Sequence, residues 1–185
     1  MSRWWRKALA VAVSLGVVGV VHADLPEFVA STYYVSPGAD GVAHTSRITA
    51  ELVDVAAATA VMAQGDPDTQ RSTAAVYLLV RLRLVAHGQT VNPSVEVVTA
   101  DGYAYTPSDE FDLPRAELVY IGEYQVTTLI FEMPKDKVPG ASVEVKPRNG
   151  LGIDAVEPVI RFRTPAVPLR DGVVELPPTE RGPVL

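Results

Sequence analysis

The stretch AAVYLLVRLRLVAH, residues 74–87, decides the fold class. Apolar and basic side chains alternate along it with a period of two, in the order Val80, Arg81, Leu82, Arg83 and Leu84. This period indicates a half-buried β-strand. The stretch LIFEMPKDK, residues 129–137, alternates in the same way until Pro134, which cannot donate a hydrogen bond to a sheet. The charged residues after Pro134 keep the following turn in water.

Further short stretches with strand character lie on both sides of these two. They are residues 47–55, 94–98, 103–105, 116–124, 141–146 and 158–163, and the second stretch itself belongs to a longer strand at residues 125–133. Asp101-Gly102 is a strong hairpin signal, and Gly122 is expected at a bulge or turn. The alanines of residues 50–64 also suit a helix, so a short helical turn is allowed there. We predict an all-β fold, an antiparallel immunoglobulin-like β-sandwich of seven to eight strands.

The N-terminal residues 1–23 have the order of an export signal. Arg3, Arg6 and Lys7 precede an apolar run, and Ala23 ends a sequence suited to signal-peptidase cleavage. We therefore expect an apolar export or anchor helix before the sandwich. The rest of the chain is expected outside the cytoplasm in the cell envelope, either membrane-anchored by residues 4–21 or secreted after cleavage at Ala23.

The remaining boundaries follow from turn residues and prolines. Residues 24–46 show no sustained periodicity and are expected to be an extended lead-in or tether. The sandwich is assigned to residues 47–164. Residues 165–185 contain five prolines and are expected to be a flexible tail that adds at most an edge strand.

Composition excludes several classes of function. The chain has 185 residues, a formal net charge of -6 and no cysteine. A basic face for nucleic acid is not expected, and sites built on cysteine are excluded. No cofactor is predicted.

A family resemblance rests on three stretches, VYLLVRLRLVA, VVTADGYAYTPSDEF and LIFEMPKDK. Their order resembles a family of bacterial extracytoplasmic immunoglobulin-like domains of unknown function, found in exported lipoproteins and single-pass envelope proteins. The resemblance covers roughly residues 50–147 and implies no catalytic residues. The chain lacks the lipid-attachment cysteine of the lipoprotein members.

Candidate site residues are few. An acidic group could supply oxygen ligands to calcium, although the same residues suit solvated turns; it comprises Asp101, Asp109, Glu110 and Asp112. Tyrosines are enriched at contact surfaces, and the candidates for partner binding are Tyr33, Tyr34, Tyr103 and Tyr105. His44 and His87 are interpreted as ordinary solvated histidines, because no short histidine-pair motif is present.

These observations predict a non-enzymatic extracytoplasmic domain that has a structural role or binds a protein partner at the membrane surface. The alternative is a sensor of a ligand or metal ion, or an accessory subunit of a membrane transporter, that uses the acidic group. A hydrolase using paired carboxylates is a third hypothesis, and it requires a concave site.

Overall fold

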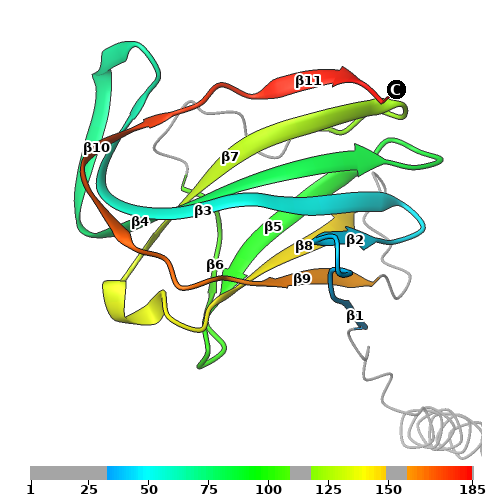
Figure 1. Ribbon diagram of the computed structural model, residues 1–185, viewed down its shortest axis with the longest axis horizontal. Coiled ribbons are helices and arrows are strands. Elements are labelled where there is room, and N and C mark those ends of the chain that lie inside the picture. The colour runs from blue at the N-terminus through cyan, green and yellow to red at the C-terminus, as the bar shows by residue number, and fades with distance from the viewer. Residues whose placement is uncertain (1–32, 109–117, 149–157, 185) are drawn as a thin grey trace, which may run out of the picture. The chain divides into compact units, whose positions relative to one another are not determined.

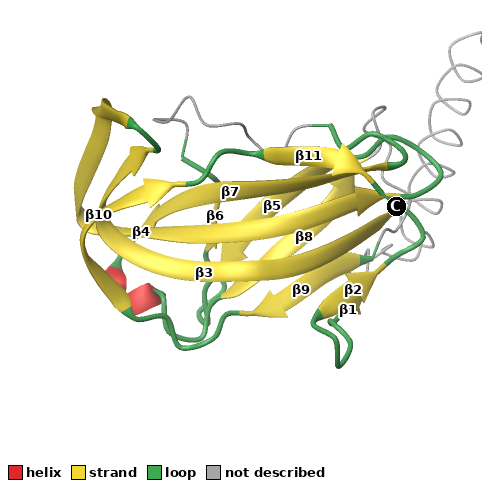
Figure 2. Cartoon of the chain, turned by 45° about the horizontal axis from the view of Figure 1, so that its top comes forward, coloured by secondary structure: helices red, strands yellow, loops and turns green. Residues whose placement is uncertain are grey.

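The computed structural model describes residues 33–108, 118–148 and 158–184. These residues form a two-layer β-sandwich, which confirms the predicted all-β class (Figure 1, Figure 2). The elements are β1 (Tyr34–Val35), β2 (Val42–His44), β3 (Ile48–Ala63), β4 (Asp66–Ala86), β5 (Asn92–Val98), β6 (Ala104–Tyr105), β7 (Glu123–Met133), the 3₁₀ helix η1 (Lys135–Lys137), β8 (Ser142–Arg148), β9 (Val159–Arg163), β10 (Leu169–Leu176) and β11 (Glu180–Pro183).

One sheet has five strands in the order β1-β9-β8-β5-β6. The other has six, with the order β10-β3-β4-β7-β11 and β2 paired to β3. The described strands outnumber the seven to eight predicted, because β1, β2, β10 and β11 lie in segments assigned to the lead-in and the tail. The sheets are also mixed: β1 runs parallel to β9, and β10 runs parallel to β3.

The main core lies between the sheets and is built by the predicted alternation. Leu78, Val80, Leu82 and Leu84 of β4 are fully buried there, as is Phe131 of β7. Every second residue of these strands faces the opposite sheet, as the period of a strand requires.

A second apolar cluster lies on the outer face of the six-stranded sheet. Its buried members are Ala56, Ala58, Val61, Tyr77, Leu79, Ile130 and Leu176. The pairing of β3 with β4 shifts register between Leu52 and Asp54, so that Ala56 and Ala58 lie on the outer face although Ala50 faces the main core. The middle of this sheet is therefore buried on both faces.

The C-terminal segment, predicted to be a flexible tail that adds at most an edge strand, contributes two edge strands. Strand β10 adds to the free edge of β3, and β11 adds to the free edge of β7. Only residues 177–179 separate the two strands, so consecutive strands form the opposite edges of one sheet (Figure 1). Leu176 packs in the second cluster, which gives the proline-containing segment an apolar anchor.

The alanine-rich stretch at residues 50–64 is strand, not helix. Ladder pairing of β3 with β4 extends over its length, and this tertiary pairing overrides the helical preference of alanine. The predicted hairpin at Asp101-Gly102 is confirmed by the pairing of β5 with β6.

The predicted export or anchor segment, residues 1–23, and residues 24–32 of the predicted lead-in lie outside the described residues. In the described part of the chain, no helix has both the length and the apolar character needed to cross a membrane.

Candidate interaction surface

A buried carboxylate organises the outer face of the five-stranded sheet. Glu96, Glu144 and Arg161 are cross-strand neighbours on β5, β8 and β9. Arg161 donates through Nε and Nη2 to Oε1 of Glu144, at 2.9 and 2.5 Å. Lys146 Nζ lies 2.6 Å from Glu96 Oε2 and 3.7 Å from Glu144 Oε2. The Glu144 side chain is only 4% exposed, and its charge is balanced by the two cations beside it.

Arg161 also stacks against an aromatic ring. Its Cζ lies 3.5 Å from the centroid of the Tyr34 ring, which is a cation–π contact. Tyr34 is 41% exposed, and the neighbouring Tyr33 is 66% exposed. Glu144 therefore holds the Arg161 guanidinium from one side. The Tyr34 ring stacks on the same guanidinium at the protein surface.

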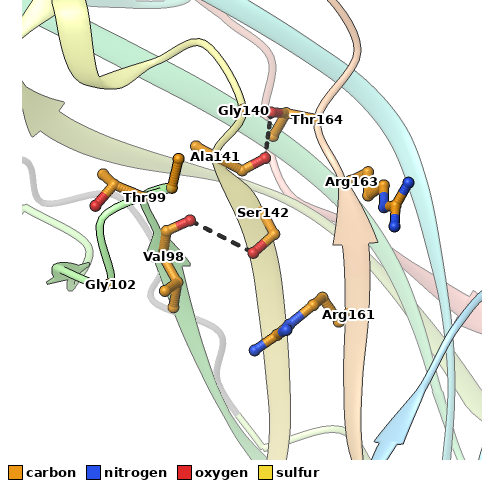
Figure 3. Close-up of a pocket in the computed structure, with 10 residues that line it drawn as sticks. Val98, Thr99, Gly102, Gly140, Ala141, Ser142, Arg161, Arg163 and Thr164 are labelled. Carbon is orange, nitrogen blue, oxygen red and sulfur yellow. Dashed lines mark hydrogen bonds between the residues drawn. The ribbon is translucent and has the colours of Figure 1, made fainter.

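A shallow pocket of about 450 Å³ adjoins this pair, between the β5–β6 hairpin and the end of β9 (Figure 3). Its lining includes the hydroxyl residues Thr99, Ser142 and Thr164. Ser142 Oγ donates to the Val98 carbonyl at 3.4 Å, and Thr164 Oγ1 donates to the Ala141 carbonyl at 2.6 Å. The pocket wall therefore combines polar and apolar groups, and two of its hydroxyls are hydrogen-bonded to backbone carbonyls.

Two arginines of β9 line the same pocket and differ in their surroundings. Arg161 extends over β8 toward Glu144, whereas the guanidinium of Arg163 points to the other side of β9 (Figure 3). No carboxylate of the described residues lies within salt-bridge distance of Arg163. Its positive charge is therefore available to a ligand.

Asp101, the first member of the predicted acidic group, is already paired. Lys137 Nζ and Thr99 Oγ1 each lie 2.6 Å from an oxygen of its carboxylate. The hydrogen bond from Lys137, followed by that from Thr99, lowers the pKa of Asp101 below its ordinary value of 3.8. The other three members of the group, Asp109, Glu110 and Asp112, lie outside the described residues. Asp101 is therefore the one proposed calcium ligand whose surroundings the structure describes.

The four candidate tyrosines do not form one surface. Tyr34 lies in the edge strand β1 and stacks on Arg161, and Tyr33 directly precedes this strand and is exposed. Tyr103 is exposed in the hairpin turn, where Lys137 Nζ lies 6.0 Å from its ring centroid. Tyr105 packs against the main core. Tyr34 is therefore the candidate tyrosine that contacts Arg161.

Sequence interpretation missed the residues that build this surface. The alternation in SVEVK and PVIRFR places Glu144, Arg161 and Arg163 on an outer face, and that much was available from the sequence. The burial of Glu144 and the stacking of Tyr34 depend on the β1–β9 and β8–β9 pairings. Those contacts join residues far apart in the chain, and no local pattern specifies them.

His44 and His87, interpreted as separate solvated histidines, lie on the other sheet and share a partner. Both rings contact the hydroxyl of Thr49. Their separation in the sequence hides this contact, because only the pairing of β2, β3 and β4 brings them together.

Comparison with known families gives no assignment. No family model matches the chain. No curated protein matches it either.

Three solved bacterial structures resemble the fold. An uncharacterized β-sandwich protein from Clostridium difficile is 13% identical with a TM-score of 0.46, and the match covers 72% of this chain and 97% of that one. The secreted protein MPT63 from Mycobacterium tuberculosis is 18% identical with a TM-score of 0.49, covering 72% and 100%. A candidate lipoprotein from Bacillus subtilis is 13% identical with a TM-score of 0.45, covering 67% and 38%. The chain is similar to these three proteins in its β-sandwich architecture.

Proposed function

We propose that the chain is a non-enzymatic, extracytoplasmic, immunoglobulin-like module that binds a protein partner through the outer face of its five-stranded sheet. The binding surface comprises Tyr33, Tyr34, Arg161 and Arg163. The observation that carries the proposal is the exposed Tyr34 ring stacked on an arginine that a buried carboxylate holds in place.

Preorganisation gives this arrangement its value for binding. Tyrosine and arginine are the residue types that most often dominate interface energetics. Binding normally loses side-chain freedom, and a guanidinium already fixed by Glu144 has less freedom to lose. Buried ion pairs add little net stability to a fold, so orientation of Arg161 is a better account of Glu144 than stability alone.

The charge of Arg163 defines the kind of partner. It has no carboxylate partner among the described residues, although the chain as a whole is acidic. A protein segment that presents Asp or Glu side chains would satisfy Arg163 and pack against the two tyrosines. The extracytoplasmic location rests on the export-like order of residues 1–23.

Site-specific photocrosslinking in the native host tests the proposal. A photoreactive phenylalanine analogue at position 33 is expected to give one discrete cross-linked protein. Arg163→Glu is expected to abolish this product by charge reversal. Arg170→Glu, which reverses an exposed arginine of β10 on the other sheet, is the matched control and should retain it.

The proposal fails if position 33 gives no discrete product in the unaltered background. It also fails if the product persists in Arg163→Glu. Circular dichroism of both charge variants establishes that each keeps the β-sheet fold.

A further inference from the structure

Two histidines approach one hydroxyl group on the outer face of the six-stranded sheet. Nδ1 of His44, in β2, lies 2.9 Å from Oγ1 of Thr49, in β3. Nε2 of His87, just after β4, lies 2.6 Å from the same oxygen. The two ring nitrogens are therefore no farther apart than the sum of these distances.

The backbone fixes this approach from both sides of β3. His44 is directly opposite Thr49 in the antiparallel pairing of β2 with β3. The His87 amide donates to the Arg47 carbonyl at 2.7 Å, which extends the β3–β4 pairing beyond Ala86. Both imidazoles are exposed, so a dissolved ion reaches them without any movement of the fold.

We propose that His44 and His87 form a two-histidine site for a divalent transition-metal ion, with Cu²⁺ bound most tightly. Neutral imidazole nitrogens are good ligands for Cu²⁺, Ni²⁺ and Zn²⁺, at bond lengths of about 2.0–2.1 Å for Zn²⁺. A shared ion requires the two nitrogens to lie at most about 4.2 Å apart, and this separation is within the bound set by their distances to Thr49. The affinity order expected for nitrogen ligands places Cu²⁺ first.

The site has two protein ligands and open coordination positions. No group of three or more His, Asp or Glu residues that could hold a metal is present in the described part of the chain. Water, or a donor from another molecule, completes the coordination shell. This site lies on the opposite sheet from Tyr34 and Arg161, so it does not depend on the proposed protein-binding surface.

Titration of the full chain with CuCl₂ tests this inference. The protein is kept in mild detergent and carries no histidine tag. Isothermal titration at about pH 7.5 is expected to give one Cu²⁺ per chain, and electron paramagnetic resonance should show hyperfine coupling to imidazole nitrogen.

The variants separate this pair from other metal-binding groups. His44→Ala and His87→Ala should each weaken Cu²⁺ binding at least about tenfold. His22→Ala removes the one other histidine of the chain and should leave binding unchanged.

Two results would overturn the inference. One is Cu²⁺ binding no tighter than that of the His44→Ala/His87→Ala double variant. The other is full affinity in either single variant. Both histidines are exposed, so their replacement should not disturb the fold. Thermal unfolding of each variant without metal checks that a loss of Cu²⁺ binding does not come from misfolding.

Discussion

At the scale of single residues, Glu144 holds Arg161 in the position where Tyr34 stacks on it. Glu144→Gln keeps the shape of the side chain and removes its charge. We expect the free energy of unfolding to fall by about 2 kcal/mol, since hydrogen bonds to charged groups contribute about 1.5–3 kcal/mol and the partly exposed cations are screened. Urea unfolding at neutral pH measures the change.

The matched control for Glu144 is Glu96→Gln. Glu96 contacts Lys146 alone among the described cations and is more exposed than Glu144. Its replacement should cost clearly less stability. Equal losses in the two variants would show that burial of Glu144 has no special role.

Asp101 makes a second prediction at this scale, on the dependence of stability on pH. Its pKa is lowered in the folded state, so its contribution to stability is present above the ordinary value of 3.8 and is lost as pH falls through the folded value. Asp101→Asn should flatten the loss of stability below about pH 4. Thermal unfolding midpoints between about pH 2.5 and pH 6 measure this, and parallel curves for the two proteins would contradict it.

At the scale of elements, β10 is held by one deeply buried side chain. Leu176 is 1% exposed within the second apolar cluster. Leu176→Ala should lower the free energy of unfolding by about 2–4 kcal/mol through lost burial and the cavity that remains. Val173→Ala in the same strand removes a side chain that is 40% exposed and should cost under about 1 kcal/mol. Similar values for the two variants would mean that β10 is loosely attached.

The elements also show how far sequence patterns reach. The period-two alternation predicts strands β4, β5, β7, β8 and β9, because the apolar residues of a half-buried strand mark its buried face in the sequence. Strand β10 was predicted at most as an edge strand and β11 was not predicted, because prolines and charges in residues 165–185 are typical of unpaired chain. Their pairing depends on edges of β3 and β7 that come from distant parts of the sequence. For the same reason, only part of the Tyr34–Arg161 surface could be predicted. Alternation shows on which face of a sheet a residue lies, but not which distant residue it contacts.

At the scale of the whole molecule, the six-stranded sheet should not be stable without its C-terminal strands. Deletion of residues 165–185 removes both edges of the sheet and uncovers the second apolar cluster. We expect the truncated chain to lose its cooperative thermal transition and to self-associate, because bare edges and apolar surface promote association. Calorimetry and light scattering test this. A truncated monomer with an unchanged transition would contradict it.

The close spacing of β10 and β11 also bears on the order of events during biosynthesis. A ribosome delivers a chain from its N-terminus, so β3, β4 and β7 all exist before either of the strands that complete their sheet. The growing chain consequently remains an unfinished sheet until residues 169–183 have emerged, and the fold is then completed at both edges within a few residues of synthesis. Until those residues are made, the second apolar cluster also lacks Leu176, and β3 and β7 each keep an unpaired stretch of edge.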